Sequence, residues 1–100
     1  MELKLQKNET NLTICLNGEL NTLTAPELSA LLDRELPGMT LLTLDFTGCD
    51  YVSSAGIRVL LTTFKQMKAA KGRMLLRNVG ENFTEVLENT GLDAVFDVLS

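Results

Sequence analysis

The 100-residue sequence contains no histidine and only two cysteines, Cys15 and Cys49. Histidine is the commonest general base near neutral pH and a frequent metal ligand, so its absence removes the usual base and most zinc sites. Two cysteines are too few for a disulfide framework, and we expect both thiols to be reduced and partly buried. Gly-rich phosphate loops and Gly-x-Ser-x-Gly motifs are also missing. We therefore expect no enzymatic activity, no cofactor and no metal.

Aromatic residues, positive charge and long apolar runs are also scarce. With five aromatic residues and no Trp, the core must consist mainly of Leu and Val. The formal net charge of −4 argues against general nucleic-acid binding. No apolar run approaches the roughly 20 residues of a membrane-spanning helix, and the N-terminus lacks a signal-peptide core. These absences predict a cytoplasmic protein that does not insert into membranes.

The sequence does contain a regular succession of strand-like and helix-like patterns. Two-residue alternation of apolar side chains predicts strands at residues 2–7, 12–16, 41–46 and 74–79. Helical spacing predicts helices at residues 24–36, 53–70 and 83–90, whereas residues 93–99 fit either a strand or a turn. The first two strands predict a hairpin, and the later strands, separated by helices, are expected to be parallel. We therefore expect one α/β domain over residues 1–100.

Three finer expectations concern particular residues. The strand at residues 41–46 is the most apolar, so we expect it in the middle of the sheet and covered on both faces. Thr24 and Glu27 have the spacing of a capping box at the start of the first helix. Lys71-Gly72 predicts that the second helix ends at a left-handed glycine.

Two adjacent serines, Ser53 and Ser54, lie where a strand pattern gives way to a helical one. A serine hydroxyl can accept a hydrogen bond from an unpaired amide of the first helical turn. The small residues Ala55 and Gly56 allow other backbone to approach closely. One serine can be a simple N-cap, but the junction also presents a hydroxyl on a rigid base.

The run from Val52 to Leu61, Val-Ser-Ser-Ala-Gly-Ile-Arg-Val-Leu-Leu, resembles the centre of the STAS domain of bacterial anti-sigma factor antagonists. Residues 18–25, Gly-Glu-Leu-Asn-Thr-Leu-Thr-Ala, resemble the Gly-Glu-Leu-Asp loop of that family, and residues 90–92 resemble its Ser/Thr-Gly-Leu turn. The resemblance extends over nearly the whole chain. It implies a mixed four- to five-stranded sheet, with an N-terminal hairpin followed by alternating strands and helices, and with the helices packed mainly on one face.

The resemblance also implies a function. Members of this family bind a serine/threonine kinase anti-sigma factor, are inactivated by phosphorylation, and are restored by a phosphatase. Their phosphorylated serine immediately precedes the Ser, Thr or Ala before the glycine, which is Ser54 here. The family's two Asp residues, before that serine and in the loop, are replaced by Ser53 and Asn21. The resemblance implies a partner-binding set of Asn21, Thr22, Ser53, Ser54, Ala55, Gly56 and Arg58.

Arg58 follows Ser54 by four residues, so both side chains are expected on one face of the helix. Its guanidinium could bind a phosphate on Ser54 through two parallel hydrogen bonds. More widely, residues 54–78 contain six basic and no acidic residues, whereas residues 79–100 contain five acidic and no basic residues. This segregation is typical of two solvated faces, or of a surface that steers a partner electrostatically.

Two other functions remain open. A STAS domain can be a non-enzymatic subunit of a larger assembly, such as a lipid-transport ABC system, in which the hydroxyl contacts the transporter without being phosphorylated. A small hydrolase with Ser54 as nucleophile is a third possibility, but the sequence offers no base for it. We expect a monomer or weak homodimer.

Overall fold

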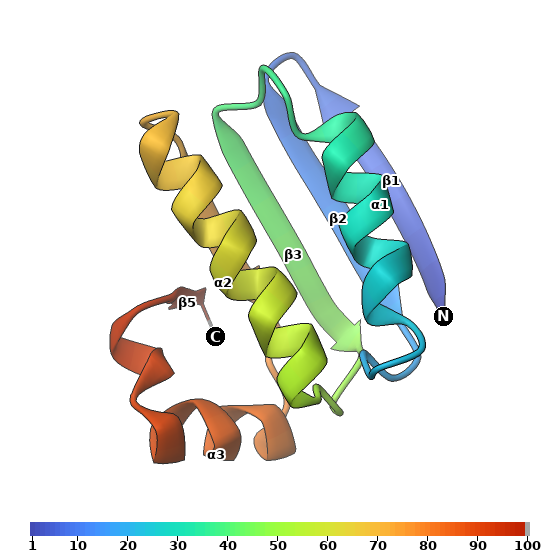
Figure 1. Cartoon of the computed structure of the whole chain (residues 1–100), viewed down its shortest axis with the longest axis vertical. Coiled ribbons are helices and arrows are strands. Elements are labelled where there is room, and N and C mark those ends of the chain that lie inside the picture. The colour runs from blue at the N-terminus through green and yellow to red at the C-terminus, as the bar shows by residue number, and fades with distance from the viewer. Residues whose placement is uncertain (100) are drawn as a thin grey trace.

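The structure is a computed structural model that describes residues 1–99, in which five strands form one sheet with three α-helices (Figure 1). The elements follow the order that the sequence predicts, and a short 3₁₀-helix precedes the last strand. Their bounds are β1 Glu2–Asn8, β2 Asn11–Asn17, α1 Ala25–Glu35, β3 Leu41–Gly48, α2 Ser54–Ala69, β4 Arg73–Arg77, α3 Glu81–Thr90, η1 Leu92–Ala94 and β5 Asp97–Leu99. The open alternative for residues 93–99 is thus resolved as a turn of 3₁₀-helix followed by a strand.

The sheet has the strand order β1-β2-β3-β4-β5 and is mixed. β1 and β2 are antiparallel, which confirms the N-terminal hairpin. The pairs β2–β3, β3–β4 and β4–β5 are all parallel, as expected for strands separated by helices. The predicted mixed α/β fold is therefore confirmed.

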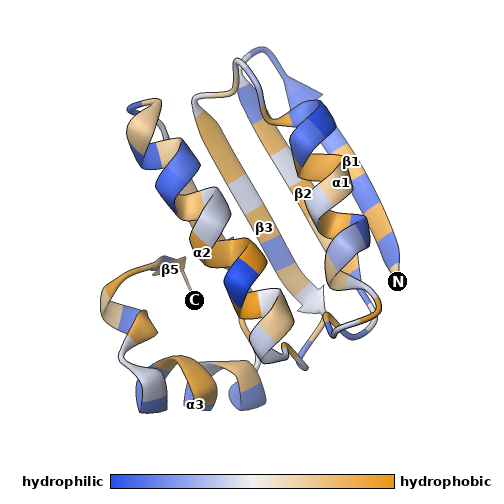
Figure 2. Cartoon of the chain, in the orientation of Figure 1, coloured by the Kyte–Doolittle hydropathy of each residue, from blue (hydrophilic) through white to orange (hydrophobic). Residues whose placement is uncertain are grey.

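α1 and α2 lie side by side over one face of the sheet, and α3 lies near the beginning of α2 (Figure 1). The strands show alternating apolar and polar bands in Figure 2, as expected when only one face contacts the helices. Their inward side chains, among them Leu12, Ile14, Leu44 and Leu76, are fully buried. Phe46 packs on Phe83 of α3 with ring centroids 5.2 Å apart, so α3 joins the same core.

The expectation for the third strand is half right. β3 is the central strand, but α1 and α2 cover the same face of it, and within residues 1–99 no helix covers the opposite face (Figure 1). Thr43 on that opposite face is nevertheless buried, and so is its neighbour Leu75 on β4, with which it pairs. Side chains of the adjacent strands therefore shield the middle of the sheet without a second helical layer.

The two helix ends lie where the sequence predicts them, but their structural details differ from the prediction. Thr24 is the N-cap residue of α1, but its hydroxyl accepts a hydrogen bond from the Asn21 amide and donates one to the Glu19 carbonyl, so its side chain makes no capping hydrogen bond. At the end of α2 the left-handed residue is Lys71, with φ 59°, and not Gly72. A Cβ on Gly72 would lie 2.9 Å from the Thr40 carbonyl oxygen, so glycine is needed there for close packing.

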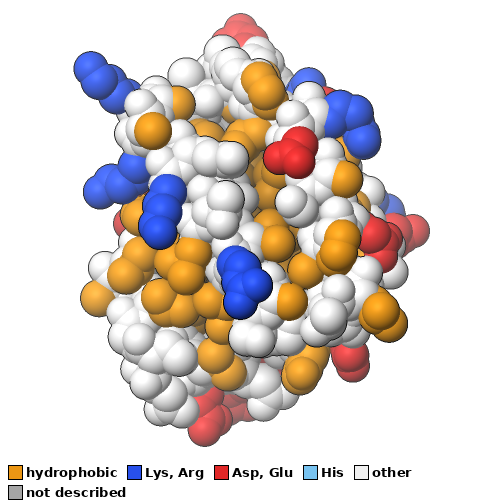
Figure 3. All heavy atoms as spheres, in the orientation of Figure 1, with side chains coloured by type: hydrophobic (Ala, Val, Ile, Leu, Met, Phe, Trp, Pro, Cys, Tyr) orange, Lys and Arg blue, Asp and Glu red, His pale blue; other side chains and the backbone are white. Residues whose placement is uncertain are grey.

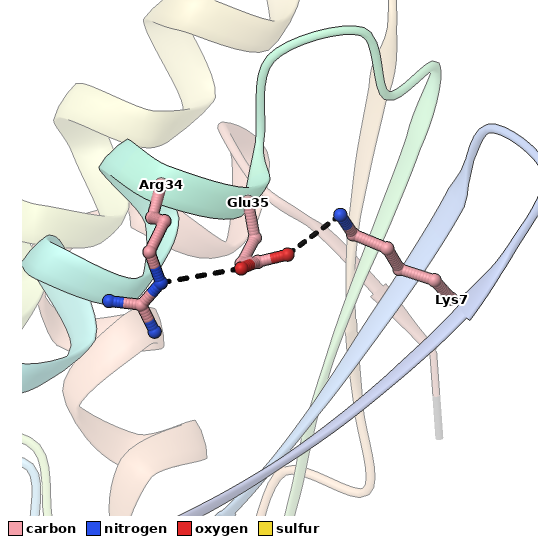
Figure 4. Close-up of polar contacts among 3 residues, drawn as sticks. All are labelled: Lys7, Arg34 and Glu35. Atoms are coloured by element: carbon pink, nitrogen blue, oxygen red, sulfur yellow. Dashed lines mark hydrogen bonds and ion pairs between the residues drawn. The ribbon is translucent and has the colours of Figure 1, made fainter.

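α1 is joined to the edge strand by a short ion-pair cluster (Figure 4). Lys7 Nζ lies 2.7 Å from Glu35 Oε1, and Arg34 Nε lies 3.3 Å from Glu35 Oε2. The hydrogen bond from Lys7 lowers the pKa of Glu35 below its usual value. Because the cluster faces solvent, it fixes the orientation of these side chains more than it stabilises the fold.

Both cysteines are free, as predicted, but neither is partly buried. Cys49 is fully buried in the core, whereas Cys15 is exposed. Cys15 is exposed because side chains alternate along β2, and its neighbours Ile14 and Leu16 point toward the helices. Cys15 therefore points to the face without helices.

Candidate functional site

The two predicted site segments meet at the end of the sheet where β2 and β3 finish. The loop that follows β2 and the loop that follows β3 are joined by a parallel bridge between Leu20 and Val52. Leu20 donates a backbone hydrogen bond to the Tyr51 carbonyl (2.9 Å), and Ser53 donates one to the Leu20 carbonyl (2.8 Å). The Asn21 loop and the two serines are thus parts of one rigid structure.

The two serines have different roles at the start of α2. Ser53 is the N-cap, in extended conformation, and its hydroxyl oxygen accepts a hydrogen bond from the Gly56 amide at 3.4 Å. Ser54 is the first helical residue and is exposed, and its hydroxyl has no hydrogen-bond partner among residues 1–99. The hydroxyl of Ser54 is therefore the one available for modification or for contact with a partner.

Gly56 brings the helix close to the bridge between the loops. A Cβ on Gly56 would lie 2.8 Å from Leu20 Cγ and 2.9 Å from Val52 Cγ1, both in buried side chains. Contacts this short are not found for real Cβ atoms, so only glycine permits the observed approach. The first turn of α2 thereby rests directly on the bridge.

Asn21 shapes the loop that faces the serines. Its side-chain oxygen accepts hydrogen bonds from the amides of Leu23 (3.0 Å) and Thr24 (3.1 Å), which folds the loop into a tight Asx turn. Thr22 is exposed in this turn. Asn21 and Ser53 thus keep the hydrogen-bond acceptors that the family's Asp residues would supply.

Arg58 lies one turn further along α2 and is exposed. It lines an open groove of about 220 Å³ between α1 and α2, together with Ser29, Asp33 and Thr62. Its guanidinium makes no ion pair with any residue in 1–99. The structure therefore brings Asn21, Thr22 and residues 53–56 together, and it leaves Arg58 beside them without an anionic partner.

Three further residues of this region, Asp50, Leu23 and Tyr51, are not among the predicted site residues. Asp50 accepts hydrogen bonds from the Phe83 amide (3.3 Å) and the Asn82 side chain (3.0 Å), so it caps α3 from a distant loop. Leu23 and Tyr51 are large apolar residues that are 84% and 54% exposed. Leu23 and Tyr51 are bulky apolar residues that fit no strand or helix period, and this pattern could have identified them as exposed from the sequence.

The potentially reactive groups near Ser54 are the Cys49 thiol and the serine hydroxyls. The only thiol nearby, Cys49, is buried, and burial raises its pKa above the usual value, so it is a poor nucleophile. The Ser54 hydroxyl is not hydrogen-bonded to any base within residues 1–99. In the same described part of the chain, His, Cys, Asp and Glu side chains form no group of three suited to a metal ion. None of the helices described is long and apolar enough to cross a bilayer.

Comparison with known proteins places the chain in a family. The sequence profile of the STAS domain matches residues 2–100, so the chain belongs to the STAS domain family. It is 34% identical over 99 residues to BtrV of Bordetella bronchiseptica, a protein described as a candidate anti-sigma factor antagonist, covering 98% of this chain and 85% of that one.

Solved structures agree with this fold. A candidate anti-sigma factor antagonist of Thermotoga maritima superposes with a TM-score of 0.92 at 19% identity, covering 98% of this chain and 86% of that one. The phosphorylated form of SpoIIAA, a Bacillus cell fate determinant, superposes with a TM-score of 0.78 at 20% identity, covering 99% of this chain and 92% of that one. At these identities the likenesses establish the fold alone.

Proposed function

We propose that this protein is an anti-sigma factor antagonist that acts by binding and not by catalysis. In this proposal its unmodified form binds a serine/threonine kinase anti-sigma factor in the cytoplasm, which frees a sigma factor. Phosphorylation of Ser54 by that kinase releases the complex, and a phosphatase restores binding. The observation that carries the proposal is the exposed hydroxyl of Ser54, the first residue of α2, which has no hydrogen-bond partner in residues 1–99.

The relatives support this assignment. BtrV, which is described as a candidate anti-sigma factor antagonist, covers nearly the whole chain at 34% identity. SpoIIAA, an anti-sigma factor antagonist by name, has solved structures in both unphosphorylated and phosphorylated forms. A phosphorylation switch on the same fold is therefore chemically reasonable for this chain.

The proposed switch depends on a change of charge and bulk at contact distance. A hydroxyl at Ser54 is small and neutral, whereas a phosphate adds about −1.5 to −2 charges at pH 7. Within a closely packed interface that phosphate must lose water, and pairing with the partner does not fully offset this cost. In the free protein the amides at the start of α2 stabilise the phosphate. Binding is therefore lost while the fold persists.

The test uses this protein with the serine/threonine kinase anti-sigma factors of the same organism, each purified and assayed in turn. Incubation with the kinase and ATP, followed by mass spectrometry, should place the phosphate on Ser54. Phosphate on Ser53 or Thr62 instead would contradict the site assignment. Thr62 is a suitable comparison because it is another exposed hydroxyl on α2.

Calorimetric binding then measures the effect of charge. Ser54→Asp should weaken binding at least about tenfold, equivalent to about 1.4 kcal/mol. Its melting temperature should stay close to that of the wild type, since a carboxylate at a helix start is mildly stabilising, by about 0.3–1 kcal/mol. Thr62→Asp is the matched control and should bind like the wild type. Loss of binding that comes only from unfolding of Ser54→Asp would argue against the switch.

A further inference from the structure

Leu23 and Tyr51 are the two most exposed large apolar residues in the described chain. Their exposed fractions are 84% and 54%, whereas the others reach at most 42%. Single exposed apolar residues are ordinary on protein surfaces, and each would need no explanation if it stood alone. These two, however, are carried by the two loops that are joined beside Ser54.

The bridge between the loops determines where these side chains point. Leu20 and Val52 face each other in the bridge and are buried, so the residues next to them alternate outward. This places Tyr51 and Ser53 on the outside, and Tyr51 is indeed exposed. Leu23 is displayed by the turn that Asn21 holds through its two hydrogen bonds to the backbone. The two apolar side chains therefore belong to two loops that are hydrogen-bonded to each other next to the start of α2.

The loops that carry them and the start of α3 are acidic, and Arg58 is an exposed basic residue beside them. Residues 18–27, 48–56 and 79–83 contain four carboxylate side chains and no Lys or Arg. These carboxylates are Glu19, Glu27, Asp50 and Glu81. A partner that matches these acidic segments in charge must present basic side chains around apolar pockets.

We propose that Leu23 and Tyr51 are the two apolar anchors with which the unmodified protein holds its anti-sigma factor. This inference rests on the function proposed above and adds the residues that supply most of the affinity. The anchors enter apolar pockets on the anti-sigma factor, and basic side chains around those pockets face the four carboxylates. Interfaces of this kind concentrate their affinity in a few buried apolar and aromatic side chains, with Tyr among the most frequent.

The anchors also explain why a modification at Ser54 is effective. The hydroxyl lies next to the joined loops that carry both anchors, and both anchors must be seated for tight binding. A phosphate there is hydrated and bulky, so it prevents the anchors from reaching their pockets even though the partner surface is basic. Long-range attraction then affects how quickly the proteins meet, whereas seating of the anchors determines how long they stay together.

The experiment measures binding kinetics of Leu23→Ser and Tyr51→Ser against the serine kinase anti-sigma factor. Each variant should bind at least about tenfold more weakly, mainly through faster dissociation. Tyr51→Phe keeps the ring and should bind within about twofold of the wild type, as should Val95→Ser, which removes an exposed apolar side chain elsewhere. Thermal melts must show all four variants folded, and raising the salt concentration should slow association of every one of them.

The outcomes separate this inference from the proposed function. If Ser54→Asp abolishes binding while Leu23→Ser and Tyr51→Ser bind like the wild type, the anchors are refuted and the function stands. If Val95→Ser loses as much affinity as they do, the effect is not specific to these residues and the inference is also refuted. Absence of any binding by the wild-type protein would overturn both.

Discussion

Replacing Gly56 by alanine should destabilise this protein, although alanine is the better helix former. Gly56 lies in the first turn of α2, and helix propensity alone predicts a gain of about 1 kcal/mol from Gly→Ala. The new methyl group, however, would lie 2.8 Å from Leu20 Cγ and 2.9 Å from Val52 Cγ1. Both neighbours are buried and cannot turn aside into solvent. Overpacking of this kind costs about 1–3 kcal/mol, and we place this site in the upper part of that range.

The net loss should therefore be about 1–2 kcal/mol. For a domain of this size this lowers the melting temperature by about 4–16 °C. Urea unfolding should show a lower midpoint with an unchanged slope, because the surface exposed on unfolding stays the same. Lys65→Ala and Lys65→Gly, at an exposed position of the same helix, measure the propensity difference without the steric conflict.

The control is a second substitution that removes part of the steric overlap with the new methyl group. In the background Leu20→Ala, which removes the contact with Leu20 but not the one with Val52, Gly56→Ala should cost clearly less stability than in the wild type. A double-mutant cycle expresses this as a coupling energy between the two positions. If Gly56→Ala is as stable as the wild type when Leu20 is kept, the close approach of α2 to the bridge does not require glycine at this position.

Two further predictions concern charge. If Arg58 binds the phosphate on Ser54, the phosphoserine should lose its second proton at lower pH in the native protein than in Arg58→Ala; identical midpoints in phosphorus NMR titrations would exclude the contact. The hydrogen bond from the Thr47 hydroxyl to Asp45 (2.6 Å) lowers the pKa of that carboxyl below its usual 3.8. Its stabilisation is therefore present above pH 3.8 and is lost as the pH falls through the lowered pKa. Thr47→Val should raise the pKa of Asp45 in NMR titrations, and its stability deficit should disappear in acid; a deficit that persists unchanged there would contradict this origin.

Most of the fold follows from local sequence patterns. Alternation along residues 41–46 and helical spacing after Ser54 predict β3 and α2 because burial of one face depends directly on side-chain period. The helix ends were harder to predict. Thr24 has alternative partners at Asn21 and Glu19 that compete with the cap, and these depend on the three-dimensional path of the loop.

One part of the candidate site could likewise be predicted from local sequence patterns, and another part could not. The position of Ser54 at the start of α2 follows from the change of period and from the STAS resemblance. The parallel bridge between Leu20 and Val52 joins residues 32 positions apart, and no local pattern indicates it. Without that bridge the outward orientation of Tyr51 cannot be derived, so exposed apolar residues near the site became visible only in the structure.

The cap that Asp50 supplies to α3 has a consequence for motion. The N-cap position of α3, Gly80, has no side chain, so the first turn of this helix depends on a carboxylate from the loop before α2. Local opening of the first turn of α3 must break the Asp50 contacts, and displacement of that loop must release Phe83. We therefore expect the amide protons of this loop and of the first turn of α3 to exchange together, as one cooperative unit. A disturbance of this loop should then change the exchange rate of the Phe83 amide, which lies 33 residues after Asp50 in the chain.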